Sequence, residues 1–310
     1  MRTRAIQNPD LSVTIGRLKL KNPVMVASGT FGYGEEFENF LDLGQLGAII
    51  PKGISLNPME GNPPPRIFET EGGILNSIGL QNPGFERFVK DKLPYLRKIK
   101  THILINIFGN TTREYIELAK RFEDVSGISG LELNISCPNV KCGGAIFGSD
   151  PRVTYRLTLG IRKATTLPLI VKLSPNVGDI VAIAKSAEDG GADAVSLINT
   201  FKAMAINIYT RKPELGNIIG GLSGPAIKPI ALRMVWEVSR HLKIPVIGMG
   251  GIMKAGDAIE FILAGASAVQ IGTANLINPE TGINVINGIK KYLLQNKTGR
   301  LKELIGLFKV

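Results

Sequence analysis

The stretch from Asn134 to Gly144 holds the residue types best suited to chemistry. It follows the apolar segment Gly130-Leu131-Glu132-Leu133, which is typical of a strand, and it brings an amide, a hydroxyl and a thiol to the end of that strand. An unpaired cysteine is usually a small buried hydrophobe. Here the polar neighbours and the glycine-rich loop that follows favour proton abstraction or nucleophilic attack by Cys137.

Seven other short apolar segments also end in polar or glycine residues. Their ends are Ser28-Gly29, Lys52-Gly53, Asn106, Lys172, Asn199-Thr200, Gly250-Gly251 and Gly272-Thr273. Two lysines, several amides and a thiol that converge on one pocket would be costly to desolvate without a ligand. The pattern therefore predicts a binding site built from strand ends.

The elements that must position these residues repeat one unit, a short β-branched run followed by a stretch of helical period. Eight such units predict an α/β fold, a (β/α)8 TIM barrel in one domain over residues 1–310, whose site lies at the carboxyl ends of the strands. An N-terminal β-hairpin around Gly16 would close the bottom, a final helix is predicted over Gly299–Phe308, and long loops 53–83 and 201–225 would cover the active face. The predicted strands are Pro23–Ala27, Ala48–Pro51, Ile103–Ile107, Leu131–Ile135, Leu169–Leu173, Ala194–Ile198, Val246–Gly248 and Ala268–Ile271.

The glycine ends of the seventh and eighth strands indicate a phosphate site. Barrels often hold a phosphate there against backbone N–H groups. The run Gly248-Met249-Gly250-Gly251-Ile252-Met253 lacks the third glycine of a dinucleotide fingerprint. A mononucleotide such as flavin mononucleotide (FMN) therefore fits better than NAD.

Composition excludes several other classes. Two cysteines cannot ligate an iron–sulfur cluster, and no metal site is predicted. The net charge of +11 is spread along helices without a basic block, which argues against nucleic acid. The polar N-terminus and the lack of any apolar run near ~18 residues predict a soluble, cytoplasmic protein without a membrane segment.

Three motifs carry a resemblance over nearly the whole chain. They are Gly-Asn-Pro-Pro-Pro-Arg at 61–66, Asn-Ser-Ile-Gly-Leu-Gln-Asn-Pro-Gly at 76–84 and Asn-Ile-Ser-Cys-Pro-Asn at 134–139. With them the chain resembles the dihydroorotate dehydrogenases, and more narrowly the class 1B, NAD-linked catalytic subunits. Class 1 uses cysteine as base, whereas the membrane-bound class 2 uses serine and carries an N-terminal helical extension. One departure is Gly53, where many members carry a small hydroxyl residue, so only a backbone contact to the flavin is expected there.

The resemblance implies FMN-dependent oxidation of (S)-dihydroorotate to orotate in pyrimidine (UMP) biosynthesis. Cys137 would remove the proton from carbon 5, and the hydride from carbon 6 would go to flavin N5. Lys172 would face the N1–C2 edge of the flavin, and Lys52 would contact both flavin and substrate. The implied flavin-binding residues are Ser28, Lys52, Gly53, Asn106, Asn134, Lys172, Ile198, Gly224, Gly250, Gly251, Gly272 and Thr273. The implied substrate-binding residues are Lys52, Asn76, Ser77, Ile78, Gly79, Leu80, Asn134, Asn199 and Thr200.

The resemblance also implies partners, because this chain offers neither cluster ligands nor a dinucleotide site. A subunit with FAD and a [2Fe–2S] cluster would pass electrons to NAD+, around a homodimer of this chain within a heterotetramer. Three alternatives stay open: a tRNA-dihydrouridine synthase, which would need a C-terminal helical domain, a fumarate-using class 1A enzyme, and a non-catalytic phosphate-binding barrel. His102 and His241 are expected to be structural, and Cys142 is expected on the surface without a role.

Overall fold

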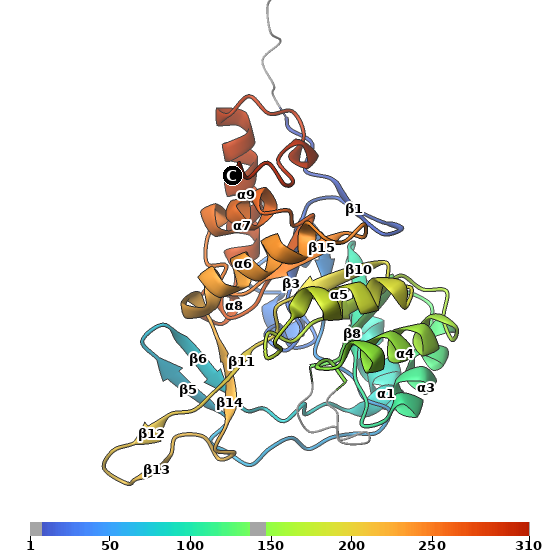
Figure 1. Ribbon diagram of the computed structural model, residues 1–310, viewed down its shortest axis with the longest axis vertical. Helices are drawn as coiled ribbons and strands as arrows, with labels where there is room; N and C mark the ends of the chain where they lie inside the picture. Colours follow the sequence, from blue (N-terminus) through green and yellow to red (C-terminus); the bar gives the residue numbers. More distant parts are fainter. Residues whose placement is uncertain (1–7, 137–146, 310) are drawn as a thin grey trace, which may run out of the picture.

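A computed structural model describes residues 8–136 and 147–309 of the chain. Eight parallel strands close into a barrel in chain order, and each pairs with the next one along the sequence until β16 returns to β3 (Figure 1). The predicted (β/α)8 barrel is therefore confirmed. Its strands are β3 (Val24–Val26), β4 (Ala48–Ile49), β7 (His102–Ile107), β8 (Gly130–Asn134), β9 (Leu169–Lys172), β10 (Ala194–Leu197), β15 (Val246–Met249) and β16 (Ala268–Ile271).

Helices follow the strands and cover the outside of the barrel (Figure 1). Local capping explains where several begin: the side chains of Thr111, Asp150 and Asp179 each accept a backbone N–H of the first turn of α3, α4 and α5. The segment after β6 combines two short α-helices around a π-helical turn, Phe88–Lys92. The α-helices are α1 (Gly84–Arg87), α2 (Leu93–Leu96), α3 (Thr112–Glu123), α4 (Pro151–Arg162), α5 (Ile180–Asp189), α6 (Lys228–Ser239), α7 (Ala255–Leu263), α8 (Ala274–Ile277) and α9 (Thr281–Gln295).

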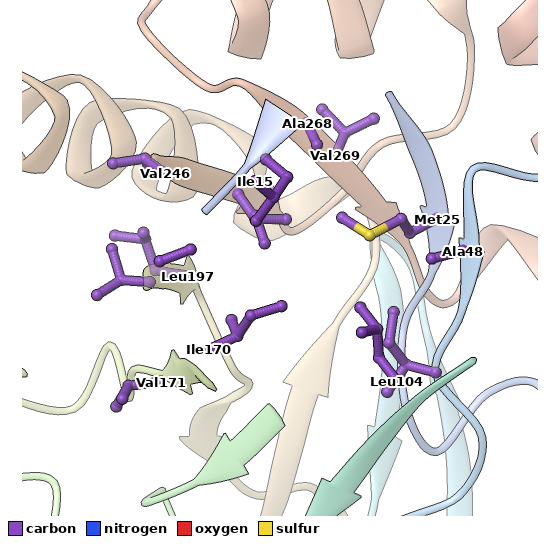
Figure 2. Close-up of a cluster of buried hydrophobic side chains, with 14 of the residues drawn as sticks. Ile15, Met25, Ala48, Leu104, Ile170, Val171, Leu197, Val246, Ala268 and Val269 are labelled. Carbon is purple, nitrogen blue, oxygen red and sulfur yellow. The ribbon is translucent and has the colours of Figure 1, made fainter. Parts of the chain in front are cut away.

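The predicted N-terminal hairpin is confirmed as β1 (Val13–Ile15) and β2 (Leu18–Leu20), which pair antiparallel. Gly16 makes the turn with a φ of 56°, in the left-handed region that glycine tolerates. Ile15 is 1% exposed. Figure 2 shows it in the middle of side chains from the barrel strands, among them Met25, Leu104 and Ile170. The hairpin thus closes the bottom of the barrel with an apolar side chain.

The two long loops contain strands that the sequence reading did not predict. β5 (Ile67–Thr70), β6 (Gly73–Asn76), β14 (Gly220–Ser223) and β11 (Phe201–Ala203) form an antiparallel sheet, in which β6 pairs with β14. A second hairpin joins β12 (Ile206–Asn207) and β13 (Lys212–Pro213). Figure 1 shows this sheet and hairpin at the end of the molecule opposite β1.

The predicted final helix over Gly299–Phe308 is wrong. Only a 3-10 turn, Leu301–Glu303, forms there. The backbone N–H groups of Gly306 and Phe308 donate to the carbonyls of Ile262 and Leu263 at the end of α7, at 3.1 and 3.0 Å. These bonds to another element take the place of the bonds that a helix would make within itself.

Candidate active site

One cavity of about 740 Å³ lies at the carboxyl ends of the barrel strands, between the barrel and the added sheet. Every predicted site residue that the structure describes lines it. Cys137 and Cys142 lie outside the described residues, although Ser136, which directly precedes Cys137, is also in the wall. The predicted residues in the wall are Ser28, Lys52, Gly53, Asn76, Ser77, Ile78, Gly79, Leu80, Asn106, Asn134, Lys172, Ile198, Asn199, Thr200, Gly224, Gly250, Gly251, Gly272 and Thr273.

The floor of the cavity is made by side chains from the barrel interior. Asn134 and Lys172 are paired in register on β8 and β9, and they are 9% and 5% exposed. The Asn134 Oδ1 atom accepts from the backbone N–H of Ser136 at 3.2 Å and from Asn199 Nδ2 at 3.4 Å. Among the residues that the structure describes, no hydrogen bond or ion pair engages the Lys172 ammonium. A nearly buried cation without a partner is a strong candidate for binding an anionic group.

A buried carboxylate lies beneath this floor, and the sequence reading did not single it out. Glu132 is 0% exposed and accepts hydrogen bonds from Asn106 Nδ2 at 2.7 Å, Ser196 Oγ at 2.9 Å and Gln270 Nε2 at 2.7 Å. The signal was present, because Glu132 interrupts the apolar strand Leu131–Ile135 two residues before Asn134 and so faces the same side. This network holds the side chain of Asn106 at the cavity wall.

Lys52 and Gly53 form a second wall. Burial, and then the nearby Arg66 guanidinium, lower the pKa of Lys52, while the carboxylate of Glu36 acts in the opposite direction. A Cβ atom at Gly53 would lie 2.6 Å from Asn106 Oδ1. Glycine at position 53 therefore leaves enough space for the side-chain amide of Asn106.

The glycines at the ends of β14, β15 and β16 bring backbone close to the cavity. Gly224, Gly250 and Gly251 have φ values of 102°, 125° and 72°, which side-chain-bearing residues rarely adopt. A Cβ atom on Gly251 would stand 2.8 Å from the Gly224 carbonyl oxygen. Thr273 donates from Oγ1 to Ser223 Oγ at 2.8 Å and joins this group to β14. Together these residues make a cradle of backbone groups, which is the chemistry that phosphate sites use.

The added sheet forms the outer wall together with the two sequence motifs at residues 61–66 and 76–84. These two motifs bind to each other. Asn62 donates from Nδ2 to Ser77 Oγ at 2.8 Å, and a Cβ atom on Gly79 would lie 2.4 Å from the backbone nitrogen of Asn62. Arg66 binds the Asn62 carbonyl, Gln81 Oε1 and the Glu60 carbonyl, so it ties the first motif to the second.

Several polar wall residues were not predicted from the sequence, and two of them, Asn62 and Asn176, make hydrogen bonds that shape the wall. Asn176 donates from Nδ2 to the Thr200 carbonyl at 3.0 Å and accepts from the backbone N–H of Lys202 at 3.0 Å, which fixes the turn after β10. The triplet Ser174-Pro175-Asn176 directly after a strand was the available signal.

The two histidines have structural contacts away from this cavity. The His102 ring nitrogens lie 3.0 Å from Ser129 Oγ and 3.1 Å from the Lys19 carbonyl of the bottom hairpin, and His241 Nδ1 lies 2.7 Å from the Glu237 carbonyl. In the described part of the chain no group of three or more histidine, cysteine, aspartate or glutamate side chains could hold a metal ion. None of the described helices is both long and apolar enough to cross a membrane.

The fold and the cavity define a (β/α)8 barrel whose polar residues gather at the strand ends, the place where barrel enzymes bind their substrates. The sequence model of the family described as dihydroorotate dehydrogenase matches residues 10–294. The chain is therefore an enzyme of the dihydroorotate dehydrogenase family.

Similar proteins support the same family. The chain is 56% identical over 298 residues to "Dihydroorotate dehydrogenase B (NAD(+)), catalytic subunit" of Geotalea uraniireducens, covering 96% of this chain and 98% of that protein. It is 57% identical over 301 residues to the protein of the same name from Thermoanaerobacter pseudethanolicus, covering 97% and 99%. A third, from Geobacter metallireducens, is 55% identical over 305 residues, 98% of this chain and all of that protein.

Proposed function

We propose that this chain oxidises (S)-dihydroorotate to orotate with bound FMN, as the catalytic subunit of an NAD-linked dihydroorotate dehydrogenase. The observation that carries the proposal is the nearly buried Lys172 ammonium beside Asn134 at the floor of a cavity of about 740 Å³. The names of its relatives support the substrate and the acceptor, and one cavity collects every described residue that the sequence associates with flavin or substrate.

The residues of the cavity fit FMN. The glycine cradle at Gly224, Gly250 and Gly251 offers backbone close to the cavity for a phosphate, and a Cβ at Gly251 would collide with the Gly224 carbonyl oxygen and so disturb this backbone. Lys172 would offer a cation to the negative charge of a reduced flavin, and Asn106 and Asn134 would offer amide groups to it, since all three line the cavity. Bound FMN would supply the acceptor for the hydride of the substrate.

The chain's own residues would then bind, orient and deprotonate the substrate. Asn76, Asn134, Asn199 and Thr200 would hold its amide and carboxylate groups, with the Lys52 ammonium as a further partner of the carboxylate. Asn134 is held from two sides by Ser136 and Asn199, so its orientation is set before the substrate binds. Cys137, next in sequence after Ser136, would take the proton from carbon 5.

A partner subunit would pass the electrons from reduced FMN on to NAD+. The relatives are named as catalytic subunits, which supports a partner, and we propose that it carries FAD and a [2Fe–2S] cluster around a homodimer of this chain in the cytoplasm. Exposed apolar side chains are available for such contacts on the β12–β13 hairpin, where Ile208 and Tyr209 are 76% and 89% exposed.

The experiment is an absorbance spectrum of the purified chain, followed by anaerobic addition of dihydroorotate. We expect yellow protein that bleaches on addition of the substrate. Yellow protein that does not bleach would keep the flavin and direct the search to another substrate, dihydrouridine in tRNA first. Colourless protein that cannot be reconstituted with FMN would overturn the proposal. Bleached protein that fumarate reoxidises, without a partner subunit, would favour a class 1A enzyme instead.

A further inference from the structure

The proposed reaction assigns no role to the buried Glu132 carboxylate or to the network of three side chains that bind it. Its members come from four different strands, β7, β8, β10 and β16, so the network crosses the inside of the barrel. All three groups that bind Glu132 donate to it, two through side-chain amide nitrogens and one through a hydroxyl. A carboxylate accepts hydrogen bonds and donates none, so this arrangement suits the ionised form.

A second observation supports a charge at this position. The Gln270 side chain turns its amide nitrogen toward Glu132, and its Oε1 atom is buried without a hydrogen-bond partner in the described part of the chain. A protonated Glu132 could donate to that oxygen if the Gln270 amide were reversed. The unpartnered oxygen is therefore the cost of presenting another donor to a carboxylate.

The carboxylate is close to the cavity without reaching it. Asn106, which binds Glu132 directly, lines the cavity, and Asn134 lies two residues further along the same strand and also lines it. Two residues of strand span roughly 6.5 Å. No described cation forms an ion pair with Glu132, so its field is not cancelled by a direct partner.

We propose that Glu132 is a positioning residue that carries a negative charge beneath the cavity floor and lowers the reduction potential of the bound flavin. It acts through Asn106, which it holds at the wall, and through its field, which opposes the extra negative charge of the reduced ring. Lys172 on the floor acts in the opposite direction. This inference rests on the proposed binding of FMN.

The test measures the FMN potential in the holoprotein by anaerobic titration against a reference dye. Glu132→Gln keeps the shape, and reversal of the Gln270 amide lets its oxygen accept from the new amide. At a fixed dye potential we expect a roughly tenfold larger ratio of reduced to oxidised FMN, an upward shift of about 30 mV for a two-electron couple. In Glu132→Gln with Gln270→Glu the charge stays in the network, and the potential should return to that of the wild-type protein.

Two further variants separate charge from structure. Gln270→Lys supplies a cation to Glu132, so the potential should rise there too, which keeps the test open if Glu132→Gln does not fold. Ser196→Ala removes one hydrogen bond to the same carboxylate without changing charge, so it should lower the melting temperature and leave the potential unchanged.

The measured potentials distinguish a charge effect of Glu132 on the flavin from a purely structural role. Potentials of Glu132→Gln and Gln270→Lys equal to that of the wild-type protein would overturn the role of Glu132 and leave it as a structural group. A shift in Ser196→Ala as large as in Glu132→Gln, or no recovery in the double variant, would also overturn it. A wild-type chain that takes up no FMN would instead overturn the proposed function.

Discussion

The two halves of the barrel interior differ in chemistry although the same strands build both. Toward the bottom hairpin the interior is apolar, with Leu104, Ile170 and Ala268 around Ile15 (Figure 2). Two residues further along each of these three strands the interior becomes polar, at Asn106, Lys172 and Gln270. Because side chains alternate along a strand, one step of two residues moves from the stabilising half to the chemical half without a change of face.

The difference predicts that substitutions in the two halves separate activity from stability. The apolar half gains its stability from close packing, so its side chains should matter for folding and hardly for chemistry. The upper half holds buried polar groups whose desolvation is costly, so the groups that face the cavity should matter for chemistry and contribute little to folding, whereas the hydrogen bonds of the Glu132 network beneath them also support the fold.

The largest effect is expected at Cys137, the residue next in sequence after Ser136. Replacing the thiol with serine exchanges a base of ordinary pKa near ~8.5 for a hydroxyl that hardly ionises, so flavin reduction should slow by roughly 10²- to 10⁴-fold. Anaerobic stopped-flow mixing with dihydroorotate measures this rate. In the wild-type protein the rate should rise with pH toward the thiol pKa, and in Cys137→Ser that rise should be absent. Equal rates in both proteins would show that Cys137 is not the base.

Lys172 in the polar half should show the separation most clearly. Lys172→Met removes the cation that would stabilise reduced flavin, so flavin reduction should slow by roughly 10²-fold. The melting temperature should stay the same or rise, because a lysine that is 5% exposed gives way to an apolar side chain of similar length. Stopped-flow rates and a thermal melt of the same preparation test both parts. A large loss of stability would show that Lys172 supports the fold and would break the comparison.

Leu104, two residues before Asn106, is the matched position in the apolar half. It is 1% exposed, so Leu104→Ala leaves a cavity and should cost about 3 kcal/mol of the free energy of unfolding. Urea denaturation of the holoprotein measures the loss, while the rate of flavin reduction per bound FMN should stay within about twofold of the wild-type rate. If the rate of flavin reduction in Leu104→Ala fell as much as in Lys172→Met, the two halves would not be independent.

The apolar half and the strand order could be predicted from the sequence because hydrophobic period is a local signal. All eight barrel strands lie where apolar runs end in polar or glycine residues. The added sheet was missed because its strands are short and half-buried: Ile67–Thr70 alternates exposed and half-buried residues, and β6 finds its partner β14 145 residues away. The β5–β6 hairpin did carry a signal, since two residues with a glycine, Glu71-Gly72, separate its strands.

The site was predicted less completely than the fold for a similar reason. Residues at strand ends are visible in sequence, whereas Glu132 acts through side chains from three other strands that only closure of the barrel brings together. Asn62 reaches the cavity through its bond to Ser77, 15 residues later. Contacts of this kind depend on tertiary geometry, and no local pattern encodes them.

The ionisation of Lys52 should make substrate binding in the polar half depend on pH. Burial, followed by Arg66, holds its pKa below the ordinary 10.5, so its ammonium loses its proton at a lower pH than a surface lysine does. If the ammonium binds the substrate carboxylate, KM for dihydroorotate should rise about tenfold as pH increases through that pKa. Steady-state assays from neutral pH to pH 10.5 measure the rise. Lys52→Arg, whose guanidinium stays charged over this range, should keep KM flat; a parallel rise in both proteins would assign the titration to another group.

The smallest effect is expected at the bottom of the apolar half, where the hairpin closes the barrel. Ile15→Val removes one methyl group from a side chain that is 1% exposed, so it should cost about 1 kcal/mol of the free energy of unfolding. Thr14→Ser is the matched control, because Thr14 on the same strand is exposed and should change the urea midpoint very little. Neither variant should alter the FMN spectrum or the potential. A shift of the potential in Ile15→Val alone would mean that packing at the bottom reaches the floor of the site, and the interior would then act as one unit in place of two.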